Sequence, residues 1–265
     1  MILPSRILGS LASSTNHYPI VLLHGLFGFS DNLNSLASDL SADQPVILVD
    51  LVNHGHAAHR DDMSYPAMAQ DVCDTLADMG VTQWIAAGHS MGGKVAMQIA
   101  AMAKQQTRAL VVLDIAPVSY KPRHREIIEA LKKVDATVIS SRSQADELLR
   151  EAIPEPLLRG FFLKNLVRNE QGIFSWRFGL SHIANAYVQI ASAPELNGEL
   201  MLPALFLRGG DSDYITTSHE PELFTCFPQA TLVTIANAGH WLHMQKRSEV
   251  ASRINAFVNE LRSAD

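Results

Sequence analysis

The chain of 265 residues lacks several features that define other classes of protein. It has only two cysteines, Cys73 and Cys226, which are too few for a disulfide framework and are expected to behave as small apolar residues. Although 47% of the residues are hydrophobic, no apolar run is long enough to span a membrane. The net charge of −6 argues against general nucleic-acid binding. These absences favour a soluble globular protein without nucleic-acid partners or stable membrane insertion.

A secretory leader is also missing from the sequence pattern. The first residues do not combine a positively charged start with an apolar stretch and a small-residue cleavage site, and residues 10–17 are polar. We therefore expect a cytoplasmic protein. The length suits one large domain or a domain with an inserted cap, and the sequence leaves the oligomeric state open.

Apolar runs alternate with amphipathic stretches along most of the chain. This alternation predicts an α/β fold, with a mostly parallel sheet covered by helices on both faces. A short antiparallel hairpin is expected in residues 2–12. The expected strands are 19–24, 46–51, 83–88, 109–114, 203–208 and 230–235, and the expected helices between them are 32–40, 66–79, 92–103 and 248–262.

One interval interrupts this alternation. Residues 119–197 contain no convincing strand, and their periodicity predicts helices near 123–133, 143–151, 155–167 and 179–191. We therefore divide the chain into a core, residues 1–117 and 201–265, and a helical cap, residues 118–200. A cap at the carboxyl edge of the sheet, where such folds bind ligands, would act as a lid.

The cap is more basic than the core. It holds 11 Lys and Arg against 10 Asp and Glu, whereas the rest of the chain holds 10 against 17. A relatively basic lid suits an anionic substrate, although Arg159, Lys164, Arg168 and Arg177 are equally well explained as solvated helix faces. The cap aromatics are expected to form cap core more often than to line an acyl pocket; they are Phe161, Phe162, Trp176 and Phe178.

The pentapeptide Gly88–Gly92 (G-H-S-M-G) is the most informative motif. It follows the expected strand 83–88 and precedes the expected helix 92–103, which is the arrangement of a nucleophile elbow. Such a turn exposes the serine hydroxyl, and its flanking glycines avoid a Cβ clash with the neighbouring strand and helix. The pattern predicts Ser90 as a catalytic nucleophile.

A second motif, Leu23–Gly28 (L-H-G-L-F-G), follows the first apolar strand. The loop after this strand can offer a backbone N–H group to an oxyanion, and the elbow helix can offer another. We expect the N–H groups of Leu26 and Met91 to form this oxyanion hole. His24, at the end of the strand, is expected to be a structural hydrogen-bonding group.

The catalytic base must come from eleven histidines. His240 follows the last expected strand in an A-G-H-W segment, which gives the order serine, acid, histidine found in α/β-hydrolases. His243 is expected to begin a helix. His54, His56 and His59 share a polar loop, but the carboxylates and cysteines that would complete a metal site are not at suitable spacing. We therefore predict His240 as the base and no metal site.

Together these motifs resemble those of the α/β-hydrolase superfamily and, within it, the YbfF-type bacterial acyl esterases. The resemblance runs from about Pro19 to the C-terminus and is weakest in the middle third. Further segments that carry it are Asp50 with 53–55 (N-H-G), 65–71 (Y-P-A-M-A-Q-D) and 113–118 (L-D-I-A-P-V). It implies an esterase or thioesterase that acts on acyl esters such as acyl-coenzyme A.

The acid departs from the commonest pattern of this superfamily. The G-x-x-D-x-x-V arrangement, placed on Gly209 and Ile215, puts Ser212 where an aspartate is expected. Asp211 and Asp213 flank that serine and remain candidates for the acid.

Asp114 is the candidate that we favour for the acid. It ends the apolar strand 109–114, from which a carboxylate can reach the same histidine, and the resemblance also points to it. Ser212 would then support the triad by a hydrogen bond to the histidine or to Asp114. A capping role for Asp114 in the loop to Pro117 is the alternative.

These residues predict two-step acyl transfer without a metal or cofactor. The substrate would be a small-molecule acyl ester or thioester. A methyl-ester or C–C bond hydrolase would use the same residues and differ in the cap. A hydrolase-like small-molecule binding protein is the alternative from another class, although such a protein would be expected to lose catalytic residues.

Overall fold

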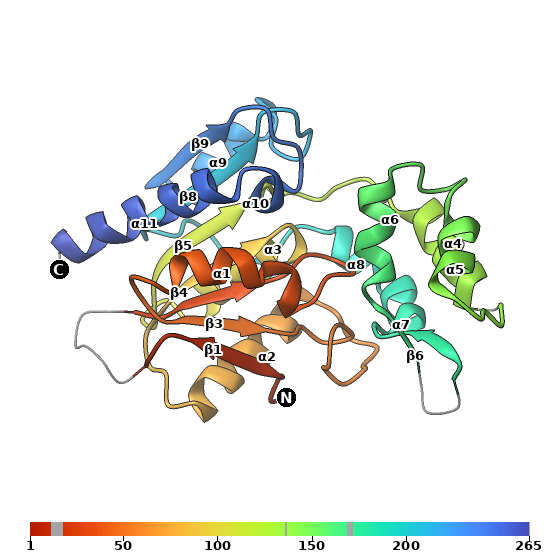
Figure 1. The fold of residues 1–265 in the computed structure, drawn as a ribbon. Coiled ribbons are helices and arrows are strands. Elements are labelled where there is room, and N and C mark those ends of the chain that lie inside the picture. The colour runs from red at the N-terminus through yellow and green to blue at the C-terminus, as the bar shows by residue number, and fades with distance from the viewer. Residues whose placement is uncertain (12–17, 136, 169–171, 265) are drawn as a thin grey trace.

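The computed structural model describes residues 1–11, 18–135, 137–168 and 172–264, and it has a seven-stranded sheet at its centre (Figure 1). The strand order is β1-β3-β2-β4-β5-β8-β9, and β1 alone runs antiparallel to its neighbour. The strands are β1 (Ser5–Leu8), β2 (Ile20–Leu23), β3 (Val46–Val49), β4 (Trp84–His89), β5 (Thr107–Leu113), β8 (Ala204–Gly209) and β9 (Ala230–Ile235). This sheet confirms the predicted α/β class and the six strands predicted from residue 19 onward.

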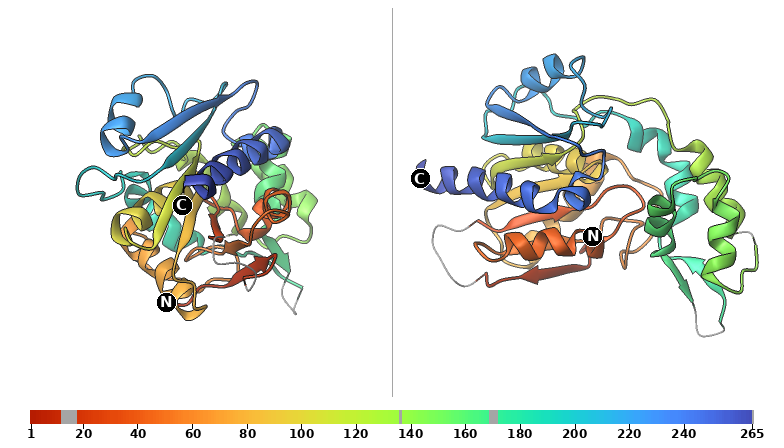
Figure 2. Two further views of the ribbon diagram at one scale, coloured as in Figure 1. Left: turned by 90° about the vertical axis from the view of Figure 1, so that its left-hand side faces the viewer. Right: turned by 45° about the horizontal axis from the view of Figure 1, so that its top comes forward.

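Helices cover both faces of the sheet, because successive strand side chains point to opposite sides. Val21 and Leu23 of β2 belong to one buried cluster, and Ile20 and Leu22 belong to the other. The helices α2 and α3 pack on the first face, and α1 and α11 contact each other on the second (Figures 1 and 2). Their bounds are α1 (Asn34–Leu40), preceded by a 3-10 turn η1 (Ser30–Leu33), α2 (Tyr65–Asp78), α3 (Met91–Met102) and α11 (Arg247–Ala264).

The chain between β5 and β8 gathers beyond the carboxyl ends of the strands, on the opposite side of the molecule from the end of α11 (Figures 1 and 2). We call residues 118–200 the inserted segment. Its helices are α4 (Arg125–Asp135), α5 (Arg142–Leu149), α6 (Pro156–Leu163), α7 (Leu180–Asn185) and α8 (Tyr187–Ala191).

The expectation that this segment contains no strand is wrong. Leu166–Arg168 (β6) pairs antiparallel with Phe174–Trp176 (β7), with Leu166 opposite Trp176. The helix expected over 155–167 accordingly ends at Leu163. Three-residue strands are too short to show a period-2 pattern, and the apolar residues of β6 continue the helical pattern of α6.

The opening hairpin expected in residues 2–12 is also absent from the described part, residues 2–11. The strand β1 pairs instead with β3, with Ser5 opposite Val49, as an antiparallel edge of the main sheet. Residue 12 lies outside the described residues. Mixed sheets of this kind are common, and the long-range partner of an edge strand leaves no local signal in the sequence.

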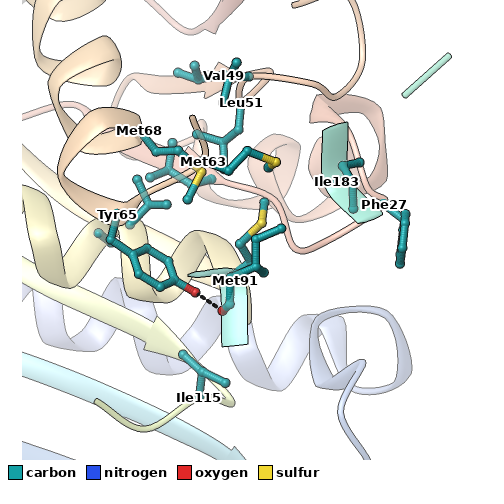
Figure 3. Close-up of a cluster of buried hydrophobic side chains, with 14 of the residues drawn as sticks. Phe27, Val49, Leu51, Met63, Tyr65, Met68, Met91, Ile115 and Ile183 are labelled. Carbon is teal, nitrogen blue, oxygen red and sulfur yellow. Dashed lines mark hydrogen bonds between the residues drawn. The ribbon is translucent and has the colours of Figure 1, made fainter. Parts of the chain in front are cut away.

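The buried cluster on the α2 and α3 face extends to the sheet edge that carries the site. Figure 3 shows Tyr65 and Met68 of α2 beside Met63, Met91 and Ile115. The hydroxyl of Tyr65 donates to the Ile190 carbonyl, which ties α2 to α8 of the inserted segment. Among the helices within the described ranges, none has the length and apolar character needed to cross a bilayer.

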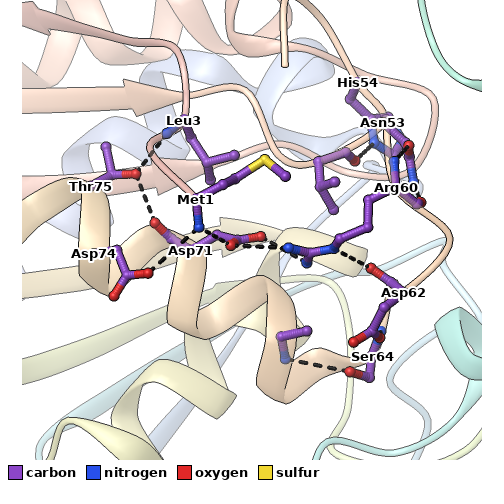
Figure 4. A network of polar contacts seen from close by, with 12 residues as sticks. Met1, Leu3, Asn53, His54, Arg60, Asp62, Ser64, Asp71, Asp74 and Thr75 are labelled. Atoms are coloured by element: carbon purple, nitrogen blue, oxygen red, sulfur yellow. Dashed lines mark hydrogen bonds and ion pairs between the residues drawn. The ribbon is translucent and has the colours of Figure 1, made fainter. Parts of the chain in front are cut away.

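A polar network fixes the loop after β3 (Figure 4). The Arg60 guanidinium binds both carboxylate oxygens of Asp71, at 3.1 and 2.8 Å, and Asp71 also pairs with the Met1 amino group. The Asn53 side chain accepts from the Arg60 N–H and donates to the Arg60 carbonyl. Arg60 therefore links the loop that carries His54 both to α2, through Asp71, and to Asn53.

Candidate active site

Ser90 occupies a strained turn between β4 and α3. Its φ of 54° and ψ of −120° lie outside the regions that ordinary residues prefer. A Cβ at Gly88 would lie 2.2 Å from the Gly92 carbonyl oxygen, and one at Gly92 would lie 2.5 Å from the carbonyl oxygens of Leu23 and His24. Both glycines are thus required by close backbone approach. Within the described residues the Ser90 hydroxyl makes no hydrogen bond, so it is open to a substrate.

Asp114 lies directly after β5 and is fully buried, with φ of 55°. One carboxylate oxygen accepts the Gly209 N–H at 2.9 Å. The other accepts His240 Nδ1–H at 2.8 Å and the Ser212 hydroxyl. The structure therefore brings together the side chains of Asp114, His240 and Ser212.

The alternative acids lie apart from His240. Asp211 and Asp213 are exposed, and the carboxylate of Asp213 binds Arg123 at 2.7 Å. Residues 211–213 follow β8 in a turn that directs the Ser212 hydroxyl inward and its two neighbours toward solvent.

His240 is fixed by two neighbours that sequence reasoning did not identify. The Tyr214 ring stacks on its imidazole, with centroids 3.8 Å apart and planes at 16°. His89 Nε2 lies 2.8 Å from the His240 carbonyl, and burial holds the pKa of His89 well below its usual value. The neutral His89 therefore donates from Nε2 and ties the His240 loop to the elbow. The position of His89 within the elbow motif was its only sequence signal.

The backbone N–H groups of Leu26 and Met91 have no acceptor within the described part of the chain. The loop that contains Leu26 is held by its neighbour Phe27, whose N–H donates to His54 Nε2 at 3.0 Å. The Phe27 carbonyl accepts from the Asn165 side chain at 2.9 Å. Two free donors on a fixed backbone are what an oxyanion hole requires.

The remaining histidines have structural contacts. His24 Nε2 accepts the Leu51 N–H at 3.0 Å, and burial lowers the pKa of His24, as expected for a structural group. His243 lies in the short helix α10 (Leu242–Gln245), where burial lowers its pKa to about 3. His56 contacts Asp50, and the ring of His59 packs on His182. Over the described ranges, no group of three or more His, Cys, Asp or Glu side chains could hold a metal ion.

Two cavities meet at Ser90. The first, which we call the apolar cavity, is lined by Ser90, His240 and Trp241, and by side chains of α4 and α6 that include Phe161 and Phe162. The second, which we call the cationic cavity after its basic residues, has lining residues that include Ser90, Met91, Tyr65, Lys94, Tyr120, Lys121, Arg123, Tyr187 and Tyr214. Two other aromatic residues of the inserted segment, Trp176 and Phe178, do not line these cavities; they are buried and their rings stack on each other.

The cap cations divide in a way that the sequence could not show. Arg159 is buried, and its guanidinium binds Asp146 at 2.7 Å and the carbonyls of Ile153 and Pro154. Arg159 therefore neither lies on a solvated helix face nor lines either of the two cavities at Ser90. Lys164 and Arg168 are exposed, and the guanidinium of Arg177 stacks on Phe29.

We expect Arg159→Met to destabilise the protein by about 1.5–3 kcal/mol, because it removes charge-assisted hydrogen bonds to Asp146 and to the carbonyls of Ile153 and Pro154. The matched change Lys164→Met removes an exposed cation at the C-terminal end of α6 and should lower the free energy of unfolding far less. Urea unfolding of the two variants checks this difference, and equal stabilities would contradict the structural role of Arg159.

Comparisons with known proteins agree with this geometry. The family model described as alpha/beta hydrolase fold matches residues 18–247. Esterase YbfF of Escherichia coli strain K12 is 40% identical over 246 residues, covering 92% of this chain and 94% of the relative. The mouse sn-1-specific diacylglycerol lipase ABHD11 is 39% identical, covering 90% and 80%.

A solved structure is similar over almost its whole length. The protein described as a marine microorganism esterase superposes with a TM-score of 0.92 at 36% identity, covering 97% of this chain and 99% of that one. The elbow, the parallel sheet and these matches lead to one conclusion: the chain belongs to the α/β-hydrolase family, among relatives named as esterases and lipases.

Proposed function

We propose that the chain hydrolyses acyl esters or thioesters through an acyl-enzyme intermediate on Ser90. The observation that carries the proposal is the hydrogen bond from His240 Nδ1 to the buried Asp114 carboxylate, beside a cavity that His240 and Ser90 both line. The names of the relatives, an esterase and a diacylglycerol lipase, support ester cleavage. An acyl-coenzyme A is the thioester that the sequence resemblance suggests.

In the first step, His240 Nε2 takes the proton of Ser90 as the hydroxyl oxygen attacks the acyl carbonyl. The carbonyl oxygen becomes an oxyanion, which accepts hydrogen bonds from the N–H groups of Leu26 and Met91. Asp114 holds the imidazole with Nδ1 protonated and stabilises its cation. His240 then gives its proton to the leaving oxygen or sulfur, and the acyl group remains on Ser90.

In the second step, water takes the place of the leaving group. His240 accepts a proton from the water, the hydroxide attacks the acyl-enzyme, and the acid leaves as Ser90 regains its proton. Ser212 supports the triad through the Asp114 oxygen that also binds His240. Its hydrogen bond fixes the carboxylate in the orientation that the imidazole needs.

The inserted segment serves as a lid in this proposal, with the core in residues 1–117 and 201–265 and the cap in 118–200. Leu158, Phe161 and Phe162 of α6 and Ile127 of α4 line the apolar cavity above Ser90. Their side chains would exclude water around the ester and contact its apolar part.

A substrate series tests the proposed function. We expect hydrolysis of p-nitrophenyl esters and of acyl-coenzyme A thioesters, measured as kcat/KM across acyl chain lengths, with an optimum set by the cavities. Binding without turnover of any member would favour a hydrolase-like binding protein. Turnover confined to methyl esters or to C–C bond substrates would move the chain to those other classes of hydrolase.

A further inference from the structure

The two cavities at Ser90 have different chemical roles if the proposed function holds. His240 must protonate the leaving group, so that group has to lie where both Ser90 and His240 are exposed. Within the described lining residues, His240 belongs to the apolar cavity alone. The leaving group therefore occupies the apolar cavity, and the acyl group that stays on Ser90 points into the cationic cavity.

Lys94 is the unusual group in the cationic cavity. It lies on α3 one turn after Ser90, and only 1% of its surface is exposed. Its ammonium is surrounded by the rings of Tyr120 at 4.8 Å and Tyr65 at 5.5 Å. It donates to the carbonyls of Ser192 at 2.5 Å and Ala191 at 3.4 Å.

No carboxylate in the described chain pairs with this ammonium. Desolvation alone lowers the pKa of Lys94 to about 7, because nothing negative nearby stabilises its charge. A buried cation is normally paired, and an ammonium has three donors, of which the two carbonyls use two.

The tyrosine hydroxyls that line the cavity already have partners; those of Tyr187 and Tyr214 contact the ring nitrogens of His124 at 2.7 and 3.4 Å. The Tyr65 hydroxyl donates to the Ile190 carbonyl, and the Tyr120 hydroxyl donates to the Tyr214 carbonyl. Lys121 adds positive charge to the lining, whereas the Arg123 guanidinium is paired with Asp213 at 2.7 Å; no described lining residue is a carboxylate. Lys94 is thus the deep donor with capacity left for a ligand.

We infer that the cationic cavity binds a carboxylate at the far end of the acyl group, through Lys94, so that the preferred substrates are monoesters or monothioesters of dicarboxylic acids. This inference rests on the proposed function and names its substrate class. The ligand carboxylate supplies the counter-ion that the chain does not, and a charge-assisted hydrogen bond in a buried site is stronger than one in water.

Three stable alkyl esters test the inference. Ethyl hydrogen glutarate and ethyl pentanoate share the five-carbon chain and the leaving group and differ in the terminal carboxylate. Carboxymethyl pentanoate carries its carboxylate on the leaving group instead. We expect kcat/KM for the glutarate ester to exceed that for ethyl pentanoate by about 10- to 100-fold, and no such gain for carboxymethyl pentanoate.

Lys94→Met keeps most of the length of the side chain, without its terminal nitrogen, and removes the charge. We expect it to reduce the glutarate-to-pentanoate ratio to about one or below. The matched control Lys104→Met removes an exposed lysine just beyond the end of α3 and should keep the ratio of the unchanged protein. If Lys94 only ties α3 to the segment after α8, its loss will lower both rates equally, and that result would overturn the inference.

The glutarate-to-pentanoate ratio of the unchanged protein tests the inference even if Lys94→Met does not fold. A ratio of one or less, or a larger gain for carboxymethyl pentanoate, would overturn the inference and leave the proposed function standing. If no ester is hydrolysed, the proposed function fails, and calorimetric binding to Ser90→Ala still tests the site. Tighter binding of ethyl hydrogen glutarate than of ethyl pentanoate would support it, and equal binding would overturn it.

Discussion

Ser90→Ala is expected to lower kcat for ester hydrolysis by about 10⁴- to 10⁶-fold, because the covalent intermediate cannot form without the hydroxyl. The fold should be retained. Alanine at φ of 54° is no more strained than serine, and the hydroxyl makes no hydrogen bond within the described residues. Steady-state kinetics and a thermal unfolding midpoint measure the two effects.

The matched control for this variant is Ser218→Ala. Ser218 is an exposed serine after β8 whose hydroxyl contacts only the Thr216 hydroxyl in the described chain. Its replacement should change neither kcat nor stability appreciably. Undiminished hydrolysis by purified Ser90→Ala would show that the elbow does not supply the nucleophile.

Asp114→Asn is expected to lower kcat by about 10⁴-fold, the loss known when the orienting carboxylate of a serine protease is replaced by an amide. The carboxylate accepts from His240 Nδ1, Ser212 and the Gly209 N–H. An amide would present a donor to one of these partners, favour the wrong tautomer of the imidazole and no longer stabilise its cation.

The neighbouring candidates provide the comparison. Asp211→Asn and Asp213→Asn change exposed side chains, one of them in an ion pair with Arg123, and should alter kcat little. Ser212→Ala removes one hydrogen bond to Asp114 and should give an intermediate loss. If Asp211→Asn or Asp213→Asn is crippling while Asp114→Asn stays active, the acid has been assigned to the wrong strand.

Much of the fold follows from local sequence patterns. The apolar runs that become β2, β3, β4, β5, β8 and β9 are bounded by turn residues, and the parallel sheet is the arrangement that buries such runs. The elbow glycines are also visible in the sequence, because their spacing is fixed by contacts within one turn. The elements that escaped prediction are those set by distant partners, such as β1 against β3, or by very short pairs, such as β6 and β7.

The site shows the same division. Ser90, Asp114 and His240 follow strands of the sheet, so their order along the chain predicts that they meet. The supporting contacts do not follow from the sequence: His54 and Asn165 reach the Phe27 backbone from segments far apart in the chain, and Tyr214 stacks on His240 through a turn with no motif of its own. Burial of Arg159 and Lys94 likewise depends on tertiary packing that periodicity cannot show.

Covalent labelling tests the central claim most directly. The protein is treated with a fluorophosphonate, and the modified peptide is identified by mass spectrometry. We expect a single adduct on Ser90, formed rapidly in the unchanged protein, slowly in Asp114→Asn and not at all in Ser90→Ala. An adduct on another residue would contradict the assignment of Ser90 as the nucleophile. Full ester hydrolysis by protein whose Ser90 has been modified would contradict it as well.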